Sequence, residues 1–125
     1  MPRLVVEAKH LDQIREHGGM PRLRDEDALE AALARPRQKW SLAPDSDLAL
    51  LAAVYAFGIA GAHPFNDGNK RTAFLTLAAF LGLNGKDLAA TEREVVQVMV
   101  ALAAGTLTEP ALATWVRGRL TKLKR

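Results

Sequence analysis

The chain has 125 residues, no cysteine and a net charge of +3. This length is enough for one domain with a proper core, over residues 1–125. The lack of cysteine excludes a disulfide framework and suits the reducing cytoplasm. Charged residues interrupt the N-terminal segment, so no signal peptide is expected. The apolar run over residues 48–62 falls short of the roughly 20 residues that a membrane helix needs.

Apolar periodicity and capping signals predict an all-α protein of about six helices. The first helix is expected over residues 8–17, where Gly18-Gly19 ends it, and the second from Asp25 to about Ala34. The third should run from Asp45 or Ser46 to near His63, and the fourth over residues 68–83, before Asn84-Gly85. Thr91 with Glu94 caps the fifth, and Thr108 caps the sixth, which has Pro110 in its first turn. Residues 4–6 are at most a short extended piece, and residues 36–45 form a loop.

Hydrophobic content predicts where these helices are buried. Residues 68–83 are apolar on nearly every side after Thr72, so this segment should be the buried central helix. The valine-rich segment over residues 95–102 also predicts wide burial. His10 and His17 fit no ligand pattern and are expected at the surface.

The stretch from His63 to Arg71, His-Pro-Phe-Asn-Asp-Gly-Asn-Lys-Arg, is the most informative part of the chain. Pro64 disfavours α geometry at the residue before it, so His63 should project from the end of a helix. Imidazole is well suited to act as a general base near neutral pH. Asp67 is the one carboxylate of the stretch, and one carboxylate plus substrate phosphates is a usual way to hold Mg²⁺.

The second half of the stretch predicts a phosphate site at the start of a helix. Gly68 lets backbone N–H groups approach an anion closely, and a helix N-terminus attracts negative charge. Lys70 and Arg71 fall in the first turn, where cations oppose the helix dipole unless an anion binds between them. Each feature alone is an ordinary helix end, turn or solvated face, and only their combination favours a function. The loop is not a Walker A loop, because Asn69 separates Gly68 from Lys70 and no strand precedes it.

This stretch resembles the Fic/Doc family motif, His-Pro-Phe-x-Asp/Glu-Gly-Asn-x-Arg. Lys70 stands where most Fic proteins have glycine, which makes the chain similar to the Doc branch, the "death on curing" toxins. Weaker elements that match in the same order are His17–Pro21, Leu23–Asp25, Leu29-Glu30, Ala32–Pro36, Phe80–Gly85, Ala104–Leu107 and Leu112–Trp115. The resemblance implies a Fic-fold helical bundle around a buried central helix.

The resemblance also implies roles for the residues of the motif. In the family, the histidine deprotonates a protein hydroxyl, the acidic residue binds Mg²⁺, and the Gly-Asn backbone and the arginine hold the phosphates of ATP. These roles correspond to His63, Asp67, the pair Gly68-Asn69 and Arg71. Positioning and charge stabilisation should then provide the rate.

Lys70 bears on which group is transferred. Typical Fic proteins transfer AMP, and their glycine leaves room for the distal phosphates, a space that a lysine would fill. Doc-like proteins bind ATP in the reverse orientation and transfer the γ-phosphate, which implies that Lys70 contacts phosphate and takes part in catalysis. Their known target class is translation elongation factor Tu, so inhibition of translation is implied. AMP transfer to another protein hydroxyl and a non-catalytic module that binds an antitoxin or nucleic acid are the alternatives.

The expected partner is an antitoxin. Many Fic proteins carry an inhibitory helix with the pattern Ser/Thr-x-x-x-Glu-Gly/Asn, and no serine or threonine of this chain fits it. Inhibition should therefore come from a separate, Phd-like antitoxin that folds on binding. The basic C-terminus, residues 117–125, is explained by cations on a last helical turn. Nucleic acid is expected only indirectly, through the antitoxin.

Overall fold

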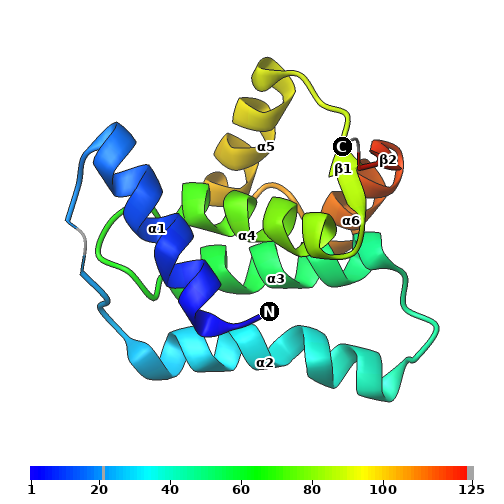
Figure 1. Cartoon of the computed structure of the whole chain (residues 1–125), viewed down its shortest axis with the longest axis horizontal. Helices are drawn as coiled ribbons and strands as arrows, with labels where there is room; N and C mark the ends of the chain where they lie inside the picture. The colour runs from blue at the N-terminus through cyan, green and yellow to red at the C-terminus, as the bar shows by residue number, and fades with distance from the viewer. Residues whose placement is uncertain (21, 124–125) are drawn as a thin grey trace.

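The structure is a computed structural model that describes residues 1–20 and 22–123. It confirms the all-α fold, because the described part of the chain forms six helices and one small antiparallel sheet at the edge of the bundle (Figure 1). The elements are α1 Arg3–His17, α2 Glu26–Leu42, α3 Leu48–Ala62, α4 Asn69–Leu83, β1 Lys86–Leu88, α5 Glu92–Ala104, α6 Glu109–Arg117 and β2 Leu120–Lys122. None of the described helices is long and apolar enough to cross a membrane.

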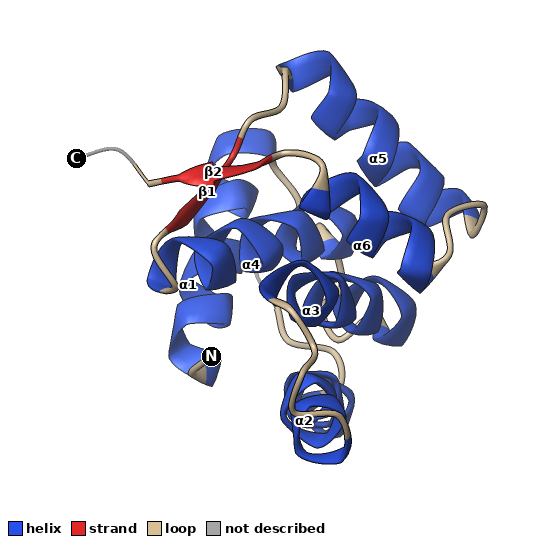
Figure 2. Ribbon diagram, turned by 90° about the vertical axis from the view of Figure 1, so that its right-hand side faces the viewer, coloured by secondary structure: helices blue, strands red, loops and turns tan. Residues whose placement is uncertain are grey.

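The central helix of the bundle is α3. Nine of its fifteen residues are buried, against five of fifteen in α4. Helices α2, α4 and α6 pack around it, and Figure 2 shows α3 nearly end-on between α2 and α4. Many of its buried residues are alanines, which let neighbouring helices approach closely. The prediction that residues 68–83 form the central helix is therefore wrong, although that segment does form the helix α4.

Two helices are longer than predicted. α1 begins at Arg3 rather than near residue 8, because Val6 is fully buried in the core and Arg3 forms an ion pair with Glu7. Residues 4–6 are therefore helical and not extended. α2 continues through Pro36 to Leu42, so the predicted loop shrinks to residues 43–47. Pro36 lacks one backbone donor, but its burial in the bundle offsets that loss.

Most of the predicted capping residues are confirmed. Asp25 caps α2, Thr108 caps α6, and Thr91 with Glu94 forms a capping box at α5. The cap of α3 is Asp47, rather than the predicted Asp45 or Ser46. Its carboxylate accepts a hydrogen bond from the Leu50 N–H at 2.9 Å.

Three regions differ from the expected burial and structure. Only Leu102 of α5 is buried, so the wide burial predicted for this helix is wrong. β1 and β2 pair in antiparallel fashion, with Asp87 opposite Thr121, and this sheet was not predicted. Of the basic C-terminal residues, Arg117 ends α6 and Lys122 lies in β2, whereas Lys124 and Arg125 lie outside the described residues.

Candidate phosphate-binding site

The loop between α3 and α4 starts with a strained residue. His63 ends α3 with φ 49° and ψ 55°, and it is the one described residue other than glycine with a positive φ. The proline that follows disfavours a further helical turn, as the sequence predicts. Arg24 donates hydrogen bonds to the His63 carbonyl from Nε at 2.9 Å and from Nη2 at 2.7 Å. The backbone of His63 is thus held in place while its imidazole is exposed to solvent.

The segment before α2 holds the first half of this loop. The N–H groups of Arg24 and Asp25 both donate to the Pro64 carbonyl, at 2.7 and 3.0 Å. Leu23 forms an isolated antiparallel bridge with Phe65. The Arg24 element, which the sequence resemblance includes without a role, therefore orders the backbone around His63.

Asn69 closes the loop on itself. Its side-chain Oδ1 accepts a hydrogen bond from the Phe65 N–H at 2.9 Å, and its Nδ2 donates to the Phe65 carbonyl at 2.8 Å. The amide side chain is thus used inside the loop. This leaves the backbone N–H of Asn69, at the start of α4, as the group that could reach a phosphate.

The second half of the loop is held by α1 and the turn after it. His10 Nε2 lies 2.8 Å from the Asp67 carbonyl oxygen, and the His10 ring stacks on Phe65 with 3.7 Å between centroids. Met20 donates its N–H to Asp67 Oδ2 at 2.9 Å. The prediction that His10 lies at the surface is wrong, since its side chain is buried. The buried residues of α1, which are Val6, His10, Gln13 and Ile14, follow a helical stripe that could have revealed it.

The start of α4, like that of α1, has no side-chain cap and so differs from the starts of the other described helices. Side chains cap α2, α3, α5 and α6, but α4 begins at Gly68 with no side-chain cap. Gly68 has φ 75°, and a Cβ at this position would collide with the Gln13 side-chain amide. Both facts require glycine here. The first N–H groups of α4 therefore remain available to an anion.

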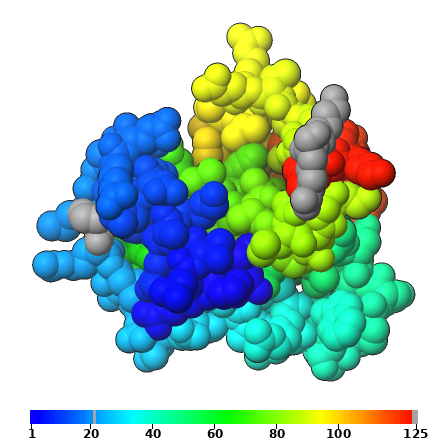
Figure 3. Space-filling view, viewed as in Figure 1, coloured from blue at the N-terminus to red at the C-terminus, as the bar shows by residue number. Residues whose placement is uncertain are grey.

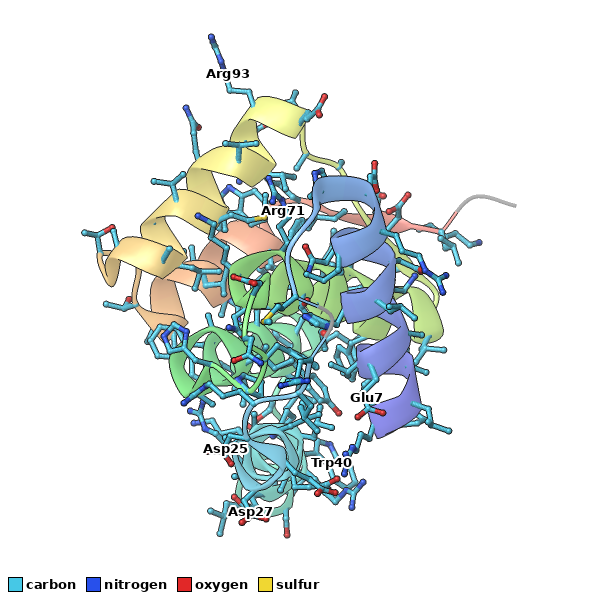
Figure 4. All side chains as sticks on the ribbon, turned by 90° about the vertical axis from the view of Figure 1, so that its left-hand side faces the viewer. Glu7, Asp25, Asp27, Trp40, Arg71 and Arg93 are labelled. Atoms are coloured by element: carbon cyan, nitrogen blue, oxygen red, sulfur yellow. The ribbon has the colours of Figure 1, made fainter. Side chains whose placement is uncertain are left out.

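Two cations lie at this helix start. Lys70 and Arg71 are exposed, and neither forms an ion pair with any residue that the structure describes. Figure 4 places Arg71 at the N-terminal end of α4, between α1 and α5. A pocket of about 280 Å³ is lined by all six predicted site residues, which are His63, Asp67, Gly68, Asn69, Lys70 and Arg71. Its other lining residues are Ala60, Asn66 and Ala103.

The donor set bears on whether Mg²⁺ could bind here. Among the described residues no three His, Cys, Asp or Glu side chains cluster as metal ligands. Asp67 uses Oδ2 to accept the Met20 N–H, and within the described part of the chain Oδ1 accepts no hydrogen bond. One carboxylate oxygen beside an anion site fits Mg²⁺ only when phosphates and water complete the shell, which is its usual mode of binding. Asp67 is the residue that would hold such an ion.

A second hollow adjoins the first. A groove of about 510 Å³ lies between α1, α4 and α5, and Figure 3 shows it between the blue and yellow helices. Phe74, Val95, Val96 and Met99 contribute apolar walls, and Arg71 lines both this groove and the pocket. The groove exists because α5 leaves its apolar side chains uncovered, with Val96 48% exposed.

Comparison of the sequence with known proteins identifies the family of this chain. The profile of the Fic/DOC family matches residues 3–81, which include α1 to α3, the whole loop and α4 as far as Leu81. The chain therefore belongs to the Fic/DOC family. It is also similar to a protein named "Protein kinase doc" of Escherichia phage P1, with 31% identity over 110 residues. That match covers 88% of this chain and 86% of the phage protein.

Proposed function

We propose that this protein is a Doc-like toxin that transfers the γ-phosphate of ATP to a protein hydroxyl. The observation that supports this best is the pocket at the start of α4. There, two cations without carboxylate partners among the described residues lie beside an uncapped helix N-terminus and an exposed histidine. The similarity to a protein named as a kinase favours phosphate as the transferred group.

In this proposal the polar and charged groups of the pocket bind the phosphates, accept the proton and hold the metal ion. The N–H groups at the start of α4, with Lys70 and Arg71, hold the phosphates of ATP in line with the target hydroxyl. His63 removes the hydroxyl proton as the hydroxyl oxygen attacks the γ-phosphorus. The bond from the γ-phosphorus to its bridging oxygen breaks, and ADP leaves. Asp67 would hold Mg²⁺, which neutralises charge on the phosphates when it is bound.

The proposed target is translation elongation factor Tu, which would place the activity in the cytoplasm and inhibit translation. This part of the proposal rests on the resemblance to the Doc branch. The target hydroxyl must approach His63 from solvent, and the exposure of the imidazole is compatible with that approach.

The proposed regulator is a Phd-like antitoxin whose C-terminal segment folds as a helix in the groove between α1, α4 and α5. Apolar walls and a charged rim, which includes Lys9, Glu16 and Glu92, suit an amphipathic helix. Because Arg71 lines both hollows, a bound segment would contact a residue of the phosphate site directly.

A labelling experiment tests the proposed activity. Purified protein is incubated with a translation extract and ATP labelled at either the α- or the γ-phosphate, and the modified protein is identified by mass spectrometry. We expect γ-label on elongation factor Tu from the wild type and from His17→Ala, which changes an exposed histidine outside the pocket. Transfer of α-label would support AMP transfer instead, and no transfer of either label would favour a non-catalytic binding module.

A magnesium titration tests the role of Asp67. Asp67→Asn keeps an acceptor oxygen for the Met20 N–H and removes the charge that a divalent ion needs. We expect the variant to require a higher Mg²⁺ concentration for half-maximal transfer. An unchanged requirement would assign Asp67 only to the structure of the turn.

A further inference from the structure

His10 contacts the site loop although it lies more than fifty positions before it in the chain. It is 4% exposed, and its Nε2 lies 2.8 Å from the carbonyl oxygen of Asp67, 57 residues away. A carbonyl oxygen only accepts hydrogen bonds, so Nε2 must carry the proton. No other described group donates to this carbonyl. Without His10, a backbone acceptor of the loop would therefore lose its partner.

The same imidazole fixes the loop at a second point. Its ring stacks on that of Phe65 with an interplanar angle of 8°, and Phe65 is itself buried. Asn69 holds the backbone of Phe65 on the other side through two hydrogen bonds. His10 thus restrains the loop at two positions, Phe65 and Asp67.

A neighbour on α1 strengthens this contact. Gln13 lies one turn after His10, is also buried, and its side-chain amide packs directly against Gly68. His10 and Gln13 are the two polar residues among the four buried side chains of α1, and both face the loop. A helix that served only as packing would place apolar side chains at these positions.

We propose that His10 is a positioning residue of the phosphate site. It holds the peptide between Asp67 and Gly68 so that the Asp67 carboxylate and the first N–H groups of α4 face the bound phosphates. His10 does not line the phosphate pocket and therefore acts through Asp67. This inference rests on the proposed phosphotransfer, and it adds a residue of α1 to the machinery.

Three variants separate positioning from packing. His10→Phe keeps a ring that can stack on Phe65 and removes the N–H donor. His10→Gln loses the ring but places a side-chain N–H at nearly the reach of Nε2. His17→Phe is the matched control, because His17 lies on the same helix and is exposed.

The kinetic test is phosphate transfer to elongation factor Tu. We expect His10→Phe to lower kcat by about 10- to 100-fold, the cost of misplacing a reacting group by about 1 Å. The KM for the target protein should stay within about twofold, because His10 does not line the pocket that the target hydroxyl approaches. His10→Gln should recover most of the loss, and His17→Phe should match the wild type. A kcat for His10→Phe equal to that of the wild type would overturn the proposal.

A second measurement does not depend on catalysis. Backbone hydrogen exchange without nucleotide reports the two halves of the loop separately, because the Met20 N–H bonds to Asp67 and the Arg24 N–H bonds to Pro64. We expect His10→Phe to accelerate exchange at Met20 by about tenfold or more and to leave Arg24 and the core of α3 unchanged. His10→Gln should exchange like the wild type.

The two measurements separate failure of this inference from failure of the proposed function. If the wild type transfers no phosphate, the phosphotransfer proposal fails, and exchange at Met20 still decides whether His10 positions the loop. Unchanged exchange at Met20 would overturn the role of His10. Acceleration throughout α3 would also overturn it, because His10 would then be a packing residue. If His10→Phe does not fold, His10→Gln and His17→Phe still decide the question. Transfer and exchange like the wild type in a folded His10→Gln would support positioning through the N–H, and slow transfer with fast exchange at Met20 would overturn it.

Discussion

The two ends of α3 differ in whether the protein's own side chains pair with the backbone groups and charges found there. At the N-terminal end, Asp47 caps the Leu50 N–H and also accepts hydrogen bonds from Arg117 of α6, at 2.6 and 3.1 Å. At the C-terminal end, His63 is exposed with a left-handed backbone, and two cations follow without an ion-pair partner among the described residues. Helix ends always leave backbone groups that need partners.

The difference shows how one helix serves two purposes. At the far end, the protein's own side chains satisfy the backbone and the charges, so that end stabilises the bundle. At the site end, the start of α4 has no side-chain cap, and its cations can receive an anion. The loop nevertheless stays ordered, because Arg24 and His10 hold its backbone although neither of them lines the pocket.

The largest expected effect is at the site end. We expect His63→Ala to lower the rate of phosphate transfer by about 10²- to 10⁴-fold, the typical cost of losing a general base. The free energy of unfolding should change little, since the imidazole is exposed and makes no hydrogen bond to the described residues. Transfer rate and urea unfolding of the same preparation measure both. A folded variant with wild-type activity would remove His63 from the mechanism.

A smaller effect is expected at Lys70, the position that bears on the transferred group. A charged contact to phosphate is worth about 1.5–3 kcal/mol, so Lys70→Gly should reduce γ-phosphate transfer at least about tenfold. The space left in the pocket would resemble that of a typical Fic protein, so transfer of AMP could emerge. Paired assays with α- and γ-labelled ATP measure the two outcomes. Unchanged γ-transfer would mean that another residue selects the phosphate.

The smallest effect on activity is expected at the far end of α3. Asp47→Ala removes an N-cap, which should lower the free energy of unfolding by about 1 kcal/mol. The exposed ion pair with Arg117 adds little. Phosphate transfer at a temperature well below unfolding should equal that of the wild type. A large loss of activity in the folded variant would show that the two ends of α3 are not independent.

The same residue gives a prediction for pH. The hydrogen bond from Arg117 lowers the pKa of Asp47 below its ordinary value, and the hydrogen bond from the Leu50 N–H adds to this. The stabilising contribution of Asp47 is therefore fully present above about pH 4 and is lost as the pH falls through the lower pKa of the folded state. Urea unfolding should show that the difference between wild type and Asp47→Ala shrinks as the pH falls from 7 toward 3. A constant difference would exclude the carboxylate charge as its cause.

Features that depend on neighbouring residues could be predicted from the sequence. Pro64 ends α3 at His63 because it acts on the residue directly before it. The caps Asp25, Thr91 and Thr108 bond to N–H groups three residues later, so they too are local. The six predicted site residues meet in one pocket because they lie within nine consecutive positions, from His63 to Arg71, across the loop and the first turn of α4. Their chemical roles stay predictions.

Features that depend on distant segments required the tertiary structure. His10 contacts the site because α1 packs against the loop. No pattern near His10 in the sequence predicts a contact with a residue 57 positions away. The valines of α5 predict burial by their composition, yet the bundle places only Leu102 against the core and leaves a groove. Local chemistry therefore determined the end of α3, the caps of three helices and the place of the site. Packing between helices decided which faces are covered and what holds the loop, because burial depends on what lies opposite a side chain.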